Sequence, residues 1–202
     1  MLERHRAFAI IRTRDPELAV TCALTLVQAG VRVLEISLTT PDALEVIRTV
    51  THEVGDDGGL GAGTVPDAAA LHRAVEAGAA YAVTPALNPA VREAVRVGVP
   101  VVAGALTPTE VATAVDLGAD AIKIFPASLG GPRYIRALTD PFPEVAFAPV
   151  GGVSLDSGRD YLDAGAVAVG LGSPLLADAA QGGDLDALAE RAHKVLASVA
   201  RS

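Results

Sequence analysis

The feature that most constrains the fold of this chain is a short phrase that recurs five times. In each copy a helical pattern ends at glycine and an apolar run rich in valine or alanine begins at once: Gln28-Ala29-Gly30-Val31, Glu76-Ala77-Gly78-Ala79, Arg96-Val97-Gly98-Val99, Asp116-Leu117-Gly118-Ala119 and Asp163-Ala164-Gly165-Ala166. Glycine can adopt the left-handed conformation that ends a helix, so a strand can start at the next residue. The phrase therefore predicts a chain in which helices and strands alternate.

Eight apolar runs are predicted as strands, and a helical pattern follows each of them. The strands are expected at Ala7–Thr13, Val31–Leu38, Gly59–Thr64, Ala79–Pro85, Val99–Leu106, Ala119–Pro126, Val145–Gly151 and Ala166–Gly172. The helices are expected to start near Asp15, Pro41, Pro66, Asn88, Pro108, Pro132, Leu155 and Asp184. Eight such pairs imply a parallel sheet, and at that count a closed (β/α)8 TIM barrel is the natural arrangement. We predict one α/β domain over residues 1–202, with a doubly wound open sheet as the alternative.

Composition narrows the class of protein. Half of the 202 residues are hydrophobic, which suits one compact domain, and the aromatic share of 3% leaves a core of Ala, Val, Leu and Ile. The net charge of −8 argues against a nucleic-acid partner. No apolar run reaches the roughly 18 residues of a membrane span, and the first residues do not resemble a signal peptide, so a cytoplasmic protein is expected. Cys22, the single cysteine, is expected to be a buried thiol.

Lys123 is the strongest candidate for a catalytic residue. It lies between Ile122 and Ile124, and strand alternation sends both isoleucines to one face and Lys123 to the other. With the isoleucines against the helices, Lys123 points into the barrel, where desolvation favours the neutral amine that attacks carbonyls. The chain has two lysines among its 16 Lys and Arg, and Lys194 lies in a polar helix. Arg cannot form an imine, so keeping Lys here favours a nucleophile over a lysine that pairs with a carboxylate.

Glu35 interrupts a second apolar strand. By alternation it shares a face with Val33 and Ser37, so it too is expected inside the barrel. A carboxylate there could be the partner of Lys123 in a buried ion pair, or it could shuttle protons beside an imine. The spacing of the sequence leaves both interpretations open.

Further candidates follow the predicted strands, because the active site of such a barrel lies at their carboxyl ends. Gly151-Gly152 follows the seventh strand and Gly170-Leu171-Gly172-Ser173 the eighth, where phosphate often binds to backbone N–H groups, although tight turns would look the same. Thr64 and Arg12 end the third and first strands and could meet an anionic substrate, or serve as a turn cap and a surface charge. No cluster has metal-ligand spacing, so no metal or cofactor is expected.

Six segments, in this order and at these barrel positions, are shared with a known family. They are Val33-Leu34-Glu35-Ile36, Gly61-Ala62-Gly63-Thr64-Val65, Val83-Thr84-Pro85, Ile122-Lys123-Ile124-Phe125-Pro126-Ala127, Gly151-Gly152-Val153 and Gly170-Leu171-Gly172-Ser173. With them the whole chain resembles the 2-keto-3-deoxy-6-phosphogluconate (KDPG) and 4-hydroxy-2-oxoglutarate (KHG) aldolases. It also has features of the branch that cleaves the galactonate epimer of KDPG.

The resemblance implies a homotrimeric class I aldolase that needs no cofactor. It assigns the imine to Lys123 and the proton transfers to Glu35. It also implies that Thr64 contacts the pyruvyl carboxylate, that Pro85 and Phe125 shape the pocket, and that Gly151, Gly152 and Ser173 hold phosphate. Gly172 is expected to bind substrate beside them. The expected reaction is reversible cleavage of KDPG, or its galactonate epimer, to pyruvate and glyceraldehyde 3-phosphate, or of KHG to pyruvate and glyoxylate.

Three departures from the family pattern bear on that reading. Thr39 stands where many members carry Arg, and Arg12 is expected to supply the missing charge. Val150 replaces a frequent Thr, which removes a hydroxyl near the middle of the substrate. The N-terminal segment is short, so the helix that often closes the barrel floor is expected to be reduced.

Two other functions are compatible with the same barrel. One is a phosphosugar epimerase or decarboxylase that forms no imine, although such enzymes usually need Asp or His at strand ends, of which this sequence offers little. The other is a non-catalytic barrel that binds a sugar acid, which fold alone does not distinguish from an enzyme.

Overall fold

The strands of the computed structural model, which describes residues 1–55 and 58–200, alternate with helices along the chain. The eight strands are β1 (Ala7–Ile11), β2 (Val33–Ser37), β3 (Gly59–Gly63), β4 (Tyr81–Val83), β5 (Val101–Ala105), β6 (Ala121–Ile124), β7 (Phe147–Pro149) and β8 (Val169–Leu171). Each lies within a predicted strand, which confirms the reading of the apolar runs. The predicted ranges extend one to three residues beyond several of these strands.

The helices are α1 (Leu2–His5), α2 (Pro16–Gln28), α3 (Ala43–Val50), α4 (Ala68–Glu76), α5 (Pro89–Val97), α6 (Pro108–Asp116), α7 (Gly131–Thr139), α8 (Gly158–Asp163), α9 (Ser173–Leu176) and α10 (Leu185–Val199), with 3-10 turns η1 (Ala127–Leu129) and η2 (Ala177–Gln181). The segment α9–η2 was not predicted, because it lacks the length for a periodic pattern. At the helix ends, all five glycines of the recurring phrase have positive φ, between 75° and 107°. This is the conformation that the phrase predicted.

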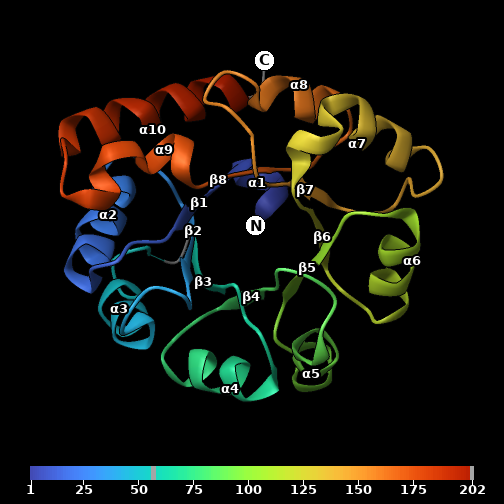
Figure 1. The fold of residues 1–202 in the computed structure, drawn as a ribbon, viewed down its shortest axis with the longest axis horizontal. Helices are drawn as coiled ribbons and strands as arrows, with labels where there is room; N and C mark the ends of the chain where they lie inside the picture. Colours follow the sequence, from blue (N-terminus) through green and yellow to red (C-terminus); the bar gives the residue numbers. More distant parts are fainter. Residues whose placement is uncertain (56–57, 201–202) are drawn as a thin grey trace.

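The strands are all parallel and follow one another in the order β7-β6-β5-β4-β3-β2-β1-β8. The ring closes between β7 and β8, where Val150 bridges Gly170 and the Val167 N–H donates to the Phe147 carbonyl at 2.9 Å. Figure 1 shows the ring of strands with helices around its outside. The (β/α)8 barrel is confirmed, and the alternative of a doubly wound open sheet is wrong.

The two faces of the barrel carry separate apolar clusters. The outer cluster joins sheet and helices and includes Ile122 and Ile124, as predicted for the strand that holds Lys123. The inner cluster fills the barrel and includes Phe8, Val33, Tyr81, Val83, Val102, Ala121, Ala148 and Val150. Strand alternation thus places Lys123 and Glu35 on the inner face.

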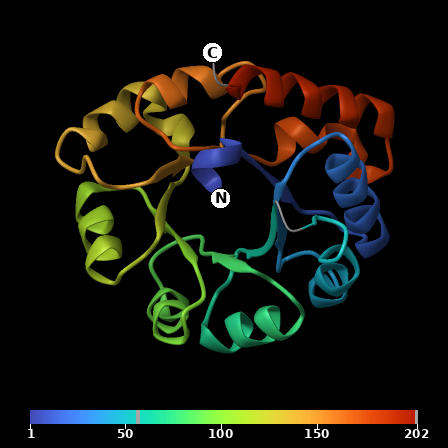
Figure 2. The same ribbon diagram turned by 180° about the vertical axis from the view of Figure 1, so that it is seen from behind.

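The floor of the barrel, at the amino ends of the strands, is covered only in part. The short α1 lies inside the ring of strands in the view of Figure 2, and its Leu2 packs against the inner cluster. A hollow of about 460 Å³ remains there, lined by Met1, Leu2, Glu3, Ala80, Tyr81, Pro100, Val101, Val102, Asp120, Ala121, Ala146 and Val167. The helix at this end of the barrel, α1, has four residues.

Among the described residues, no helix has the length and apolar character needed to cross a membrane.

Candidate active site

A cavity of about 640 Å³ opens at the carboxyl ends of the strands. Nine of the ten predicted site residues line it: Arg12, Thr64, Pro85, Lys123, Phe125, Gly151, Gly152, Gly172 and Ser173. The tenth, Glu35, does not reach its surface. The cavity is also lined by residues that sequence reasoning did not single out, including Ile10, Pro174 and Gln181. Gln181 was missed because it lies in the unpredicted turn η2.

Lys123 is buried in this cavity, with only 5% of its surface exposed. It projects from β6, and its ammonium or amine nitrogen lies 5.3 Å from the centre of the Phe125 ring. Phe125 lines the same cavity and is 44% exposed. A primary amine that is almost fully buried and lines a cavity can act as a nucleophile toward a carbonyl compound bound there.

Glu35 is fully buried beneath the cavity. Its carboxylate occupies the space over Gly63, where a Cβ would lie 2.5 Å from Oε1. Neither oxygen has a hydrogen-bond partner among the described residues, Lys123 included, so a hydrogen-bonded ion pair with that lysine is not formed. Burial raises the pKa of Glu35 above its ordinary 4.5, and the positive charges of Lys123 and then Arg12 offset this only in part.

A cluster of hydroxyl groups lies beside Arg12 at the ends of β1, β2 and β3. The Arg12 side chain donates to Ser37 Oγ and to Thr64 Oγ1, each at 3.2 Å. Ser37 Oγ also lies 2.9 Å from the hydroxyls of Thr39 and Thr64. Ser37 Oγ is thus a hydrogen-bond partner of both Arg12 and Thr39. Ser37 is fully buried at the centre of this cluster. It was not predicted as a site residue, although its position on the inward face of β2, the face of Glu35, could have indicated it.

The glycines after β7 are required by close contacts. Gly151 and Gly152 have φ of 84° and 86°, which disfavour any other residue. A Cβ would lie 2.9 Å from the Phe125 ring at Gly151 and 2.5 Å from Ser128 Cβ at Gly152. The backbone therefore runs close to the cavity without side chains between them. With Gly172 and Ser173 after β8 it forms what we call the glycine wall (Gly151, Gly152, Gly172 and Ser173).

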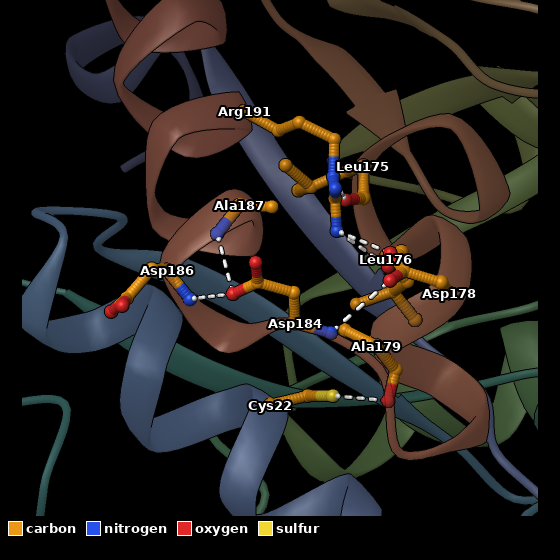
Figure 3. Close-up of polar contacts among 9 residues, drawn as sticks. All are labelled: Cys22, Leu175, Leu176, Asp178, Ala179, Asp184, Asp186, Ala187 and Arg191. Atoms are coloured by element: carbon orange, nitrogen blue, oxygen red, sulfur yellow. Dashed lines mark hydrogen bonds and ion pairs between the residues drawn. The ribbon is translucent and has the colours of Figure 1, made fainter.

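The segment α9–η2 continues that wall. Figure 3 shows the polar contacts that hold this segment in place. Arg191 of α10 donates to the Leu175 and Leu176 carbonyls at 2.7 and 2.9 Å. Asp178 accepts from the Asp184 N–H at 3.1 Å. Cys22 of α2 contributes a weak bond from its thiol to the Ala179 carbonyl at 3.5 Å. Burial raises the pKa of this thiol, as expected for a structural cysteine rather than a nucleophile.

Within the described part of the chain, no group of three His, Cys, Asp or Glu side chains could hold a metal ion.

The chain was compared with known proteins. A family model described as KDPG and KHG aldolase matches residues 1–190. A 2-dehydro-3-deoxy-phosphogluconate aldolase of Dickeya dadantii (strain 3937) is 39% identical over 184 residues, which cover 90% of this chain and 86% of the relative. A 2-dehydro-3-deoxy-6-phosphogalactonate aldolase of Escherichia coli (strain K12) is 37% identical over 169 residues, which cover 83% and 82%.

Among solved structures, the fold resembles that of a KDPG aldolase from Legionella pneumophila, with pyruvate captured at low pH as a covalent carbinolamine intermediate. The TM-score is 0.87 at 27% identity, and the match covers 96% of this chain and 95% of that chain.

Proposed function

Because the chain belongs to the KDPG and KHG aldolase family, and is therefore a carbon–carbon lyase, we propose that it cleaves a 2-keto-4-hydroxy acid through an imine on Lys123. The observation that carries this proposal is the position of Lys123, which is 5% exposed and lies in the cavity at the mouth of the barrel. The pyruvate captured as a carbinolamine in the Legionella relative supports the same chemistry. A small keto acid is the proposed partner.

In the proposed reaction, Lys123 Nζ attacks the C2 ketone to give a carbinolamine, which loses water to become a protonated imine. The C4 hydroxyl gives up its proton, the C3–C4 bond breaks, and its electron pair moves into the imine to form an enamine. The aldehyde product leaves at this point. Protonation of the enamine at C3 and hydrolysis of the imine then release pyruvate and restore the lysine.

Glu35 is the proposed acceptor of the C4 hydroxyl proton and donor of the proton to C3. Support comes from its environment, since the described residues give its oxygens no hydrogen bond and burial raises its pKa. A carboxyl group whose pKa is moved toward neutrality can both take and give a proton at the working pH. Because the oxygens do not line the cavity, the transfer is proposed to run through one water molecule.

Two anion sites would orient the substrate around Lys123. The hydroxyl cluster with Arg12 offers a positive charge and several O–H donors, which suit the carboxylate of the pyruvyl group. The glycine wall offers approachable backbone, which suits the phosphate. Pro85 and Phe125 are proposed to shape the pocket between them.

The proposed substrate is the phosphorylated six-carbon acid rather than KHG. Val150 lines the cavity with methyl groups and offers no hydrogen bond to a substrate hydroxyl. We therefore propose that the galactonate epimer is cleaved at least as fast as KDPG itself. A panel of both epimers and KHG under one condition tests this choice, and a clear preference for KHG would contradict it.

A homotrimer is the proposed assembly, and this part of the proposal rests on the family membership alone. Light scattering combined with size-exclusion chromatography measures the mass of the particle, for which three copies of the 20.5 kDa chain are expected.

Borohydride reduction in the presence of pyruvate tests the imine directly. We expect an irreversible pyruvyl adduct on Lys123, located by peptide mass spectrometry, and loss of activity in step with labelling. Lys194 is an internal control, since it is more than half exposed and paired with Asp156 at 2.9 Å. An adduct on Lys194 alone, or none, would contradict the proposal and favour a barrel enzyme that forms no imine.

A further inference from the structure

The inward face of β3 is built from glycine alone. Gly59, Gly61 and Gly63 follow one another from the floor to the mouth of the barrel, and each leaves a space that another residue fills. A Cβ at these positions would lie 2.5 Å from Met1 Sδ, from the Tyr81 ring and from Glu35 Oε1, respectively. The three glycines therefore form a groove in which Tyr81 lies directly below the Glu35 carboxylate.

Tyr81 reaches across this groove to the strand that carries Glu35. Glu35, Gly61 and Tyr81 are neighbours in the parallel register of β2, β3 and β4. The Tyr81 ring lies over Gly61, and its hydroxyl donates to the carbonyl of Leu34 at 2.8 Å. Since Leu34 precedes Glu35, this bond holds the peptide group from which Glu35 projects. Burial and then the nearby charge of Glu35 raise the pKa of Tyr81 well above its ordinary value, so the hydroxyl stays a donor.

The opposite side of Tyr81 faces the floor hollow of about 460 Å³. The ring is thus a partition, with that hollow on one side and Glu35 on the other. A hollow that opens to solvent admits water, whereas Glu35 is fully buried. Without the ring, the groove over Gly61 would connect the two.

We propose that Tyr81 is a positioning residue for Glu35: its ring keeps the water of the floor hollow away from the carboxylate, and its hydroxyl fixes the adjoining peptide. This inference rests on the proposed role of Glu35 as the proton shuttle. Desolvation is the largest influence on Glu35, ahead of the charges of Lys123 and Arg12. In the described chain, the charged and titratable groups that act on the Glu35 carboxylate are Lys123, Arg12 and Tyr81. Water from below would therefore lower the pKa of Glu35 toward 4.5.

Two variants of Tyr81 separate the ring from the hydroxyl, and Phe8→Leu is a matched control. Phe8 is another buried aromatic of the inner cluster, and it packs against Gly170 of β8 rather than against β3. The readout is the exchange of pyruvate methyl protons with solvent, followed by NMR across pH. This exchange requires both the imine and the base, so borohydride trapping on each variant reports the imine separately.

In Tyr81→Leu we expect the acid limb of the exchange profile to move down by about one pH unit, since burial shifts of this size are common. Because a carboxylate of lower pKa is a weaker base, the maximal exchange rate should fall by roughly tenfold. In Tyr81→Phe the ring stays, so the acid limb of the exchange profile should stay in place. Loss of the hydrogen bond to Leu34 should lower the maximal exchange rate by a few-fold without changing KM for pyruvate. Phe8→Leu should lose stability as Tyr81→Leu does, but its exchange profile should keep the acid limb and the maximal rate of wild type.

If the wild type traps and exchanges pyruvate but the acid limb of Tyr81→Leu does not move, the inference is overturned and the proposed function stands. A shift of the same size in Phe8→Leu would also overturn it, because any loss of interior packing would then suffice. If Tyr81→Leu does not fold, an unchanged rate in Tyr81→Phe overturns the role of the hydroxyl. A wild type that neither traps nor exchanges pyruvate would refute the proposed function, and the inference with it.

Discussion

Two glutamates of this chain show how differently the barrel interior and the helical surface treat the same side chain. Glu35 lies fully buried in the barrel, and the described residues give its oxygens no hydrogen bond. Glu93 lies on α5, where it pairs with Arg96 at 2.6 Å and with His72 of α4 at 2.7 Å. Burial raises the pKa of Glu35, whereas hydrogen bonds from Arg96 and then His72 lower the pKa of Glu93 to about 2.

The two pKa shifts have opposite consequences for the stability of the folded protein. A group whose folded pKa is raised prefers to be protonated in the native state, so the folded protein loses stability as pH rises from 4.5 toward that raised pKa. A group whose folded pKa is lowered gives the opposite sign, with stability fully present above 4.5 and lost as pH falls through about 2. An ionised Glu35 therefore costs stability, as expected if this carboxyl group is kept for the proposed proton transfer.

The largest expected effect is on activity in Glu35→Gln, which keeps the shape and removes the charge. If Glu35 is the shuttle, aldol cleavage and methyl-proton exchange should fall by roughly 10²–10⁴-fold, the usual contribution of a general acid–base group. Borohydride trapping on Lys123 should persist. The thermal midpoint should rise relative to wild type, and this gain should be larger at pH 8 than at pH 4. A near-normal exchange rate at the optimum pH of the variant would contradict the shuttle role.

A smaller effect is expected from Gly63→Ala, which places a methyl group in the space of the Glu35 carboxylate. The Cβ would lie 2.5 Å from Oε1 and 2.8 Å from Cδ of Glu35, while the φ of Gly63 is not in the left-handed region, so the strain falls on Glu35 alone. We expect cleavage to fall by roughly 10–100-fold, since small displacements of a catalytic group have effects of this order.

A double-mutant cycle with Glu35→Ala checks the cause of that loss. Once the carboxylate is absent, Gly63→Ala should have almost no effect on folding stability, so the two changes should not be additive. Additive losses of stability would mean that the methyl group disturbs the strand itself rather than Glu35.

The contrast between these glutamates also explains what the sequence could predict. Strand alternation placed Lys123 and Glu35 on the inner face, and the recurring glycines marked the helix ends, because both depend on local backbone geometry. The partnership of Ser37 with Arg12 depends on two strand ends meeting, and the segment α9–η2 has no periodic pattern. The depth of Glu35 below the cavity follows from the inward glycines of β3, whose neighbours come from other strands. The direction of the Lys123 and Glu35 side chains could therefore be predicted from the sequence, whereas the residues that surround them could not.

The smallest expected effect lies at the surface, in Glu93→Gln. Its carboxylate accepts two bonds from Arg96 of the same helix and one from His72, and the bond from His72 links α4 to α5. Exposed ion pairs of this kind contribute little to stability, and salt screens them. Cleavage should therefore be unchanged, and the thermal midpoint should drop slightly at neutral pH and low salt. The drop should shrink as pH falls below 4.5 toward 2, because wild type then loses the ionised Glu93 as well.

Thermal unfolding of wild type, Glu93→Gln and Glu35→Gln between pH 2 and 7 measures how the midpoint difference between each variant and wild type changes with pH. If this pH dependence were the same for the two variants, burial of Glu35 and pairing of Glu93 would not have the opposite effects on stability that the structure indicates.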